Sequence, residues 1–462
     1  MSEIERLRRT EGPTPRAVLV GVQLPDVSDE AFESSLVELS RLADTLGLEI
    51  VARVTQRRSA LASGAVLGDG KLKELAEHTG GTGVVPGYVP PGKKREEDEE
   101  RIPLSTDRPA ATIVLVDHDL TPSQMRNLEK ATDAEVLDRS MVILSIFQRH
   151  ARTREARMQV EIARLAYMAP RLREANVGQD RQRGGVGGKG AGESALELDR
   201  RKIRDRIAEL RQELENVKRE ADTRRSRRTE AYTVALVGYT NAGKSSLMRA
   251  LTGDEVYVAD QLFATLDTTV RILLPETKPR ILVTDTVGFI KKLPHDLVAS
   301  FRSTLEEAKD ASILLHVVDG SDPAFRDQYQ VTREVLEEIG AASNPSLLVL
   351  NKADRLTPEQ REALALEYPE AVILSARSKE DVSALHDRIV EFFERTMEDD
   401  EFLVPYADAR HVAMLHERAR VLDEQYEEEG TRIRVRAPSA ILGSLRREIR
   451  GEEKAERDDD ED

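Results

Sequence analysis

Cysteine is absent from the 462 residues, and aromatic side chains make up only 4% of them. Without thiols the chain can form neither disulfides nor thiolate metal sites, and nothing in its composition points to secretion. No uninterrupted apolar run approaches the roughly 18 residues that a membrane-spanning helix needs. The first residues, Met1–Arg6, also lack the apolar stretch of a secretory signal. We therefore expect a cytoplasmic protein of roughly two to four domains that does not insert into membranes.

Lysine is scarce as well, because arginine outnumbers it about three to one in a chain with a net charge of -16 and 33% charged residues. An acidic surface with little lysine and few aromatics is typical of proteins adapted to high salt. Ordinary acidity, exaggerated by the tail Asp458–Asp462, would give a similar composition. Both explanations stay open.

The charge is unevenly distributed along the chain. Residues 151–228 contain 21 Lys or Arg and 13 Asp or Glu, a local net charge of +8, so the remainder carries -24. A basic module inside an acidic protein indicates that a polyanionic partner contacts that module.

The sequence Gly-Tyr-Thr-Asn-Ala-Gly-Lys-Ser occupies Gly238–Ser245. The apolar run Val234–Val237 precedes it, and the helical pattern Ser246–Leu251 follows. Strand, glycine-rich loop and helix in this order predict a P-loop, in which backbone N–H groups surround a phosphate. Lys244 would reach the β and γ phosphates, and the Ser245 hydroxyl would ligate Mg²⁺.

The chain around this loop predicts an α/β fold in several domains. Strands and helices alternate strictly over 231–398, which predicts a mostly parallel sheet with helices on both faces. An N-terminal α/β domain precedes it, and a small C-terminal α/β domain, with a helix over 409–426, follows it. The expected domains are residues 1–150 with a mobile insertion at 79–109, a basic helical hairpin at 151–230, the P-loop domain at 231–398, the small domain at 399–450 and an acidic tail at 451–462.

The hairpin at 151–230 has two narrow apolar seams, one on each helix, and a glycine-rich segment between them. Basic side chains on such a glycine scaffold can approach a phosphate backbone closely, which predicts a tip that contacts RNA. A flexible linker is the alternative. The RNA-contact candidates are Arg181, Arg183, Lys189, Arg200 and Arg201.

Three segments of the P-loop domain lie at strand ends, which is where open α/β sheets bind their ligands. We expect these segments to contact the nucleotide and its Mg²⁺. Asp285 would hold the Mg²⁺ shell through water, and the Gly288 N–H would meet the γ-phosphate. The Asp354 carboxylate can accept two hydrogen bonds from guanine, whereas adenine lacks the exocyclic donor. The Ala376 N–H would meet guanine O6. A threonine within Leu262–Thr269 would complete the Mg²⁺ shell only when the γ-phosphate is bound, which predicts a switch.

With these motifs the chain resembles the HflX family of translational GTPases, within the Era/Obg-like group. Inside the P-loop domain the resemblance rests on Gly238–Ser245, Phe263–Asp267, Asp285–Ile290, Asn351–Asp354 and Ser375-Ala376, and outside it on Ser123–Lys130, Asp138–Ile146, Ala151–Thr153, Gly184–Glu193 and Asp199–Arg201. The resemblance implies that Thr265 is the Mg²⁺-binding threonine. The full set of candidate GTP-binding residues is Gly238, Tyr239, Thr240, Asn241, Ala242, Gly243, Lys244, Ser245, Phe263, Ala264, Thr265, Leu266, Asp267, Asp285, Thr286, Val287, Gly288, Asn351, Lys352, Ala353, Asp354, Ser375, Ala376 and Arg377.

The site lacks a catalytic glutamine. Phe289 stands where Ras-like proteins place the residue that orients water, and its ring cannot hydrogen-bond water. No arginine is identifiable as an intrinsic finger. Asn241 resembles the P-loop asparagine that supports K⁺ in related GTPases, and it could equally brace the loop. We therefore expect slow hydrolysis that a partner stimulates.

The resemblance implies which partner this is: the large ribosomal subunit and its rRNA, with a role in ribosome splitting, rescue or recycling. The alternative is a nucleotide-regulated RNA-binding factor in large-subunit assembly. An ATP-driven helicase would need a second P-loop, which the sequence lacks. We expect a monomer that binds GTP or GDP with Mg²⁺, is partly ribosome-associated and does not bind DNA.

Overall fold

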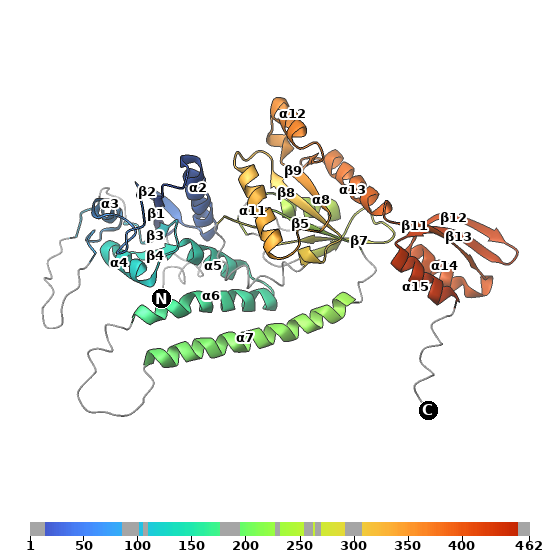
Figure 1. Ribbon diagram of the computed structural model, residues 1–462, viewed down its shortest axis with the longest axis horizontal. Helices are drawn as coiled ribbons and strands as arrows, with labels where there is room; N and C mark the ends of the chain where they lie inside the picture. Colours follow the sequence, from blue (N-terminus) through green and yellow to red (C-terminus); the bar gives the residue numbers. More distant parts are fainter. Residues whose placement is uncertain are drawn as a thin grey trace. The chain divides into compact units, whose positions relative to one another are not determined.

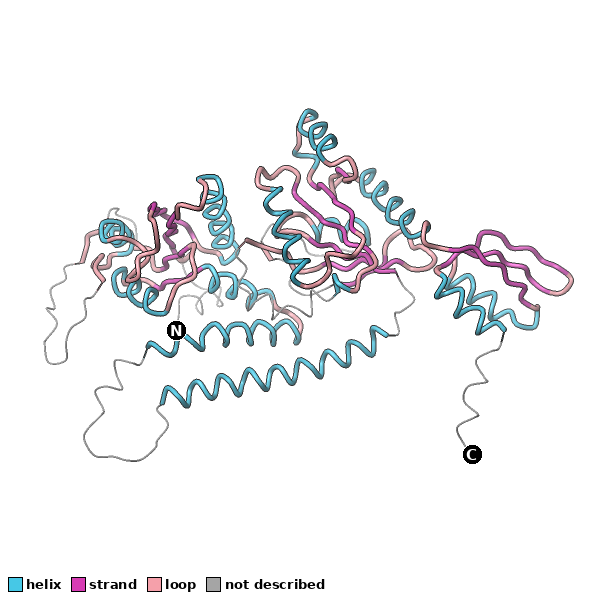
Figure 2. Tube along the Cα trace, viewed as in Figure 1, coloured by secondary structure: helices cyan, strands magenta, loops and turns pink. Residues whose placement is uncertain are grey.

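A computed structural model shows two compact units, between which the chain crosses more than once (Figures 1 and 2). Unit 1 comprises residues 1–217, 260–266 and 291–302, and unit 2 comprises 218–259, 267–290 and 303–462. None of the described helices combines the length and apolar content needed to cross a bilayer. The structure describes residues 14–85, 101–104, 110–175, 195–226, 232–253, 262–263, 269–291 and 307–450.

Unit 1 contains a four-stranded parallel sheet in the order β2-β1-β3-β4. The strands are β1 (Arg16–Gln23), β2 (Glu49–Arg57), β3 (Ile113–Val116) and β4 (Glu135–Asp138). The helices with them are α2 (Asp29–Leu46), α3 (Asp69–Thr79), α4 (Pro122–Thr132) and α5 (Arg139–His150). All four residues of β3 are buried, as expected for a parallel strand covered on both faces.

Local signals set the ends of α2. The Ser28 side chain accepts a hydrogen bond from the Ala31 N–H, and Gly47 ends the helix in the left-handed conformation at φ 76°. The apolar positions Phe32, Leu36 and Leu39 face the core. These signals and the apolar periodicity account for a helix over Asp29–Leu46.

The predicted hairpin consists of α6 (Arg154–Ala175) and α7 (Ala195–Ser226). Arg154 pairs with Glu213 at 2.9 Å, and Glu161 pairs with Arg206 at 3.0 Å. The start of α6 therefore lies beside the later part of α7, so the two helices run antiparallel as expected. Their apolar seam comprises Met158, Ile162, Leu165, Ile207, Leu210, Leu214 and Val217.

Unit 2 contains a six-stranded sheet in the order β10-β9-β8-β5-β7-β6, in which only β6 is antiparallel to its neighbour. The strands are β5 (Tyr232–Val237), β6 (Thr269–Ile272), β7 (Ile281–Asp285), β8 (Ile313–Asp319), β9 (Ser346–Asn351) and β10 (Val372–Ile373). The helices are α8 (Lys244–Thr252), α11 (Phe325–Glu338), the short η2 (Ala353–Arg355), α12 (Pro358–Glu367) and α13 (Lys379–Glu394). The mostly parallel sheet agrees with the sequence prediction.

The C-terminal part of unit 2 is a three-stranded antiparallel sheet in the order β11-β13-β12. Its elements are β11 (Glu398–Val404), η3 (Tyr406–Asp408), α14 (Ala409–Arg418), β12 (Arg420–Glu427), β13 (Gly430–Ala437) and α15 (Ser439–Arg450). Ile433 and Val435 of β13 pack in one core with Leu442 and Leu445 of α15.

The helix expected over 409–426 is wrong in its second half. It ends at Arg418, and Arg420–Glu427 forms β12, because pairing with β13 satisfies that backbone better than continuing the helix. The acidic strand β11 was also missed. Its Asp399 and Glu401 form ion pairs with Arg436 and Arg432 of β13, so long-range partners stabilise it.

His316 on β8 makes unit 2 sensitive to acid. It is 6% exposed, and no residue in the described ranges hydrogen-bonds its Nδ1. Burial, aided by the nearby Arg333 charge, lowers its pKa to about 4. The unfolded chain takes up this proton near pH 6.5, so it binds more protons than the folded chain between that pH and about 4. The free energy of unfolding should therefore fall by about 3 kcal/mol as pH drops through this window.

Urea unfolding at several pH values, compared with a His316→Gln variant, measures this contribution. The variant should show a shallower pH dependence than the wild type. Identical curves for wild type and His316→Gln would show that His316 titrates normally.

Candidate functional site

The loop Gly238–Ser245 connects β5 to α8, as the motif predicts. Gly238 has φ 152° and Gly243 has φ 95°, both in the region that favours glycine. A Cβ atom on Gly238 would lie 2.1 Å from the Val317 carbonyl oxygen, and one on Gly243 would lie 2.2 Å from Nδ2 of Asn351. Side chains are therefore excluded at both positions. Because α8 begins directly at Lys244, its first N–H groups are available to an anion.

Lys244 is buried within the loop that precedes it. Its Nζ donates to the carbonyl oxygens of Gly238 at 3.0 Å and Tyr239 at 2.9 Å. Burial lowers the pKa of this ammonium to about 8, and the Asp285 carboxylate opposes that shift. The side chain thus lies along the curve of the loop, where a phosphate would meet it.

The Ser245 hydroxyl donates to Oδ2 of Asp285 at 2.7 Å. Asp285 is the last residue of β7 and is 2% exposed. A hydroxyl and a carboxylate oxygen side by side are the ligands that Mg²⁺ prefers, so these residues fit the ion. Within the described residues no cluster of three His, Asp or Glu side chains suits a metal held by protein ligands alone.

The segment after Asp285 lies against the glycine-rich loop. The Thr286 hydroxyl donates to the Leu236 carbonyl at 2.7 Å, and Val287 is buried. A Cβ on Gly288 would lie 2.8 Å from Cγ2 of Thr240 and 3.0 Å from Nζ of Lys244. Glycine here therefore permits close approach to the site.

Phe289 packs in the interior instead of facing the site. It is 2% exposed; its N–H donates to the Gly238 carbonyl at 3.1 Å, and its carbonyl accepts from the Thr240 N–H at 2.8 Å. Sequence reasoning identified the missing glutamine, but this backbone bridge could not be read from it. The described side chain offers no hydrogen bond to water.

Asn351 and Lys352 brace the loop from β9. Asn351 donates through Nδ2 to the Ala242 carbonyl at 2.9 Å and accepts from the Ala376 N–H at 3.0 Å. Nζ of Lys352 lies 2.8 Å from the Asn241 carbonyl and 2.7 Å from the Asp319 carboxylate.

Two of these contacts differ from expectation. The Ala376 N–H, expected at guanine O6, donates to Asn351. Asp319, which sequence reasoning missed, ends β8 at the same sheet edge as the other candidates, and that position was the signal for it. Asn241 has φ 60°, and its backbone carbonyl accepts from Lys352. This contact does not distinguish the two roles expected for its side chain, which both stay predictions.

Asp354 presents a partly exposed carboxylate at the other end of the site. Its Oδ1 accepts from the Ser375 hydroxyl at 2.7 Å, and Arg377 lies 3.8 Å from its Oδ2. The hydrogen bond from Ser375, with a smaller contribution from Arg377, holds the pKa of Asp354 below its usual value. The Ser375 N–H donates to Asp381, another residue that sequence reasoning missed. An ionised, oriented acceptor therefore projects from this edge.

The expected switch segment is described only at its start, where it belongs to unit 1. The Leu262 N–H donates to the Thr45 hydroxyl at 3.2 Å, and the Phe263 ring meets Phe147 edge-on at 4.6 Å. Phe263 is 3% exposed and has φ 56°. The other expected switch residues, Ala264, Thr265, Leu266 and Asp267, lie outside the described residues.

A second segment of the P-loop domain sequence also packs in unit 1. The Lys291 carbonyl, which follows Asp285–Ile290, accepts from Nη2 of Arg139 at 3.2 Å. Nothing in the sequence pattern indicated that residues on both sides of the P-loop domain's motifs would join the N-terminal unit.

Of the RNA-contact candidates, Arg200 and Arg201 lie on α7. Arg181, Arg183 and Lys189 lie outside the described residues, as do the acidic tail and most of the charged insertion.

Three family descriptions match consecutive parts of the chain. "GTP-binding GTPase N-terminal" matches residues 33–85 and 95–148, "GTP-binding GTPase Middle Region" matches 150–228, and "50S ribosome-binding GTPase" matches 233–352.

Individual proteins are similar over nearly the whole length. A protein named GTPase HflX from Gluconacetobacter diazotrophicus is 57% identical over 449 residues, which cover 95% of this chain and 99% of that protein. GTPase HflX from Escherichia coli is 37% identical over 428 residues, covering 92% and 93%. Among solved structures, a GTP-binding protein of Sulfolobus solfataricus in complex with GDP has 24% identity and a TM-score of 0.41, covering 82% of this chain and 98% of that one.

Proposed function

The chain belongs to the HflX family of GTPases and is a GTP-hydrolysing enzyme, and we propose that it acts on the large ribosomal subunit, which stimulates its hydrolysis. The stimulated reaction serves ribosome splitting, rescue or recycling. The observation that carries the guanine assignment is the oriented Asp354 carboxylate, held by Ser375 at the strand edge that also bears the P-loop.

Different residues of the site bind different parts of the nucleotide in this proposal. Gly238–Ser245 and the start of α8 bind the phosphates, and Lys244 turns its ammonium from loop carbonyls to phosphate oxygens. Asp354 accepts from the guanine N1–H and N2–H₂ groups, while Asn351 and Lys352 hold the loop in position. Ala353, Ser375 and Arg377 border the base.

Mg²⁺ would be held by the Ser245 hydroxyl, with Asp285 contacting it through water and Thr265 joining when GTP is bound. When bound, the ion neutralises charge on the β and γ phosphates. Asp285 orients the Ser245 hydroxyl through their 2.7 Å hydrogen bond.

Stimulation by a partner follows from what the site contains. Phe289 is packed inside and cannot orient water, so the described residues leave that task to an added group. Leu262 and Phe263, which lead into the expected switch, are held by α2 and α5 of unit 1. Binding of rRNA to the basic hairpin of the same unit can therefore bias the switch. The match to "50S ribosome-binding GTPase" supports the ribosome as partner.

Sedimentation with purified ribosomal subunits under GTP, GDP and a non-hydrolysable analogue, with hydrolysis rates measured alongside, tests this function. We expect co-sedimentation with the large subunit under the analogue and stimulation of about ten-fold or more. A double variant Arg200→Glu, Arg201→Glu should lose stimulation, whereas Arg271→Glu on β6 should keep it. Large subunits that bind the protein without changing turnover would favour the second candidate, a nucleotide-regulated RNA-binding factor in assembly.

A further inference from the structure

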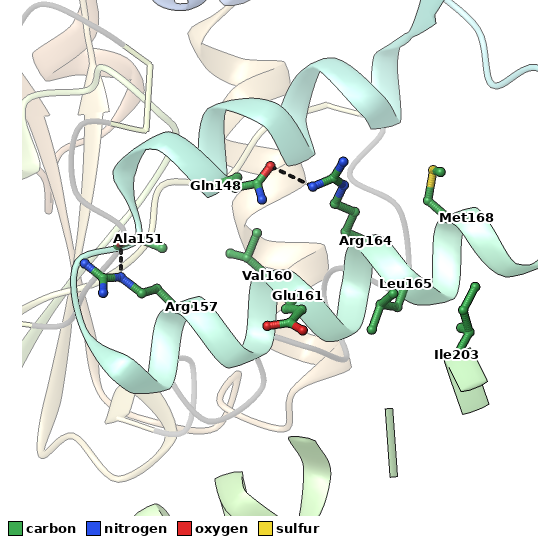
Figure 3. A pocket seen from close by; sticks show the side chains of 9 residues that line it. All are labelled: Gln148, Ala151, Arg157, Val160, Glu161, Arg164, Leu165, Met168 and Ile203. Atoms are coloured by element: carbon green, nitrogen blue, oxygen red, sulfur yellow. Dashed lines mark hydrogen bonds between the residues drawn. The ribbon is translucent and has the colours of Figure 1, made fainter. Parts of the chain in front are cut away.

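A cavity of about 600 Å³ lies between α5, α6 and α7 of unit 1, and none of the residues that line it belongs to the P-loop. Its apolar wall is formed by Ala151, Val160, Leu165, Met168 and Ile203. In Figure 3, Ile203 faces Met168 and Leu165 from α7, so the cavity opens between two helices. Cavities of this size with apolar walls and a few polar groups are typical of sites that bind small molecules.

Two arginines stand at the rim of this cavity. Arg157 and Arg164 are seven residues apart on α6, about two turns, and so project from one face of the helix. Nε of Arg157 donates to the Ala151 carbonyl at 3.2 Å, and Nη1 of Arg164 donates to Oε1 of Gln148 at 3.3 Å (Figure 3). Glu161, which lies between them, pairs with Arg206.

Neither rim arginine has a carboxylate partner among the residues that the structure describes. Each guanidinium carries five N–H donors, so most of them are free to bind an anion. The amide nitrogen of Gln148 likewise faces the cavity without a recorded partner in the described part of the chain. The rim therefore combines the two arginine charges and the Glu161 carboxylate, which Arg206 neutralises, with one amide that can read a polar edge.

These features match an unstacked nucleotide. A base is flat and largely apolar on its faces and polar at its edge, and it carries a phosphate on each side within a chain. The hairpin that forms two walls of the cavity lies in the segment with net charge +8, so a polyanion is favoured over a free neutral ligand. Single-stranded RNA can extend a base into a protein pocket, whereas bases in a duplex stay stacked.

We propose that this cavity receives one base of single-stranded RNA, with Arg157 and Arg164 on the flanking phosphates and Gln148 at the base edge. The proposal rests on the proposed function, since it names a contact through which unit 1 would engage rRNA. It adds a site on the body of the hairpin, separate from the glycine-rich tip.

Fluorescence anisotropy of a short, end-labelled oligouridylate over a range of KCl concentrations tests the cavity, with an RNA duplex as the comparison. Met168→Trp and Ile203→Trp fill the cavity from opposite helices without changing charge. Each should weaken single-strand binding about ten-fold or more, leave its salt dependence unchanged and leave duplex binding unchanged. Thermal melting of each variant checks that it folds. Because the two substitutions lie at different positions, the test still works if one of the variants does not fold.

The double variant Arg157→Gln, Arg164→Gln should reduce the slope of log affinity against log salt by about 1.4, since each single-strand phosphate contact contributes about 0.7. Arg154→Gln removes one positive charge from the same helix, but Arg154 pairs with Glu213 outside the cavity, so the slope should stay close to that of the wild type. Unchanged single-strand affinity in both folded tryptophan variants, or equal weakening of single strand and duplex, would overturn the proposal.

GTP hydrolysis with and without large ribosomal subunits separates this proposal from the proposed function. If subunits stimulate hydrolysis but the tryptophan variants bind RNA normally, the cavity assignment alone fails. If the variants lose single-strand binding but subunits never stimulate the wild type, the ribosomal function alone fails.

Discussion

Replacing Asp354 with Asn should lower kcat/KM for GTP by about 10⁴-fold and raise it for xanthosine triphosphate. The reason is complementarity: the carboxylate accepts from two guanine donors, and an amide presents a donor where guanine also donates. Xanthine carries a carbonyl in place of the exocyclic amine and so suits the amide. Competition assays with both nucleotides give the ratio of kcat/KM for GTP to kcat/KM for xanthosine triphosphate. Binding and turnover are measured separately.

Two further variants serve as controls for the Asp354→Asn experiment. Glu359→Gln neutralises an exposed carboxylate on the neighbouring helix α12 and should leave nucleotide preference unchanged. Ser375→Ala removes the hydroxyl that orients Asp354 and should weaken GTP binding without creating a preference for xanthosine nucleotides. An Asp354→Asn variant that still prefers GTP by the wild-type margin would refute the assignment of the base site.

Replacing Arg139 with Met should destabilise unit 1 by about 3–5 kcal/mol, because it leaves buried carboxylates without their main charge partner. Arg139 is 2% exposed, its Nη1 lies 2.7 Å from Asp117, and its Nη2 contacts Glu38. Asp117 is itself 1% exposed and also accepts from the Ser35 hydroxyl at 2.6 Å. Urea unfolding of the variant and the wild type, followed by circular dichroism, measures the loss.

The control for this prediction lies on the same helix. Arg149→Met removes an exposed guanidinium that contacts the Thr45 and Leu46 carbonyls, and it should cost less than about 1 kcal/mol. Combining Arg139→Met with Asp117→Leu and Glu38→Met should recover part of the stability, since no buried charge then remains at the site. A loss below about 1 kcal/mol for Arg139→Met alone would show that water reaches the carboxylates.

Arg139 also connects stability with function. Nη2 of Arg139 donates to the Lys291 carbonyl. Arg139→Met therefore also releases the segment that follows Asp285–Ile290 in the chain. Charge patterning could not indicate this arginine as a core residue, because an isolated Arg on a helix is usually solvated. Its partners come from α2, from the end of β3 and from a segment about 150 residues later.

The C-terminal strands β11 and β12 also could not be predicted from the local sequence. The residues of β12 suit a helix by local preference, and those of β11 are so acidic that they suggest a loop. Arginines 432 and 436 on β13 and the shared core with α15 override both preferences.

The sequence by itself was enough to predict a nucleotide site and to place its segments in an α/β sheet. Gly238–Ser245, Asp285–Gly288 and Asn351–Asp354 are short segments, each at the end of a strand, and parallel strands bring such ends to one edge whatever the remaining side chains are. The family resemblance rested on these segments together with others outside the P-loop domain, such as Ser123–Lys130 and Asp138–Ile146. The residue types of these segments and the order of the strands were enough to predict the site.

Only the tertiary structure decided which of those residues hold the loop, and where the residues leading into the expected switch are attached. Asn351 turned out to clamp Ala242 and Ala376, and Leu262 and Phe263 packed against Thr45 and Phe147. All of these contacts except that between Asn351 and Ala376 join residues more than a hundred positions apart. They depend on packing between elements whose own patterns contain no information about one another.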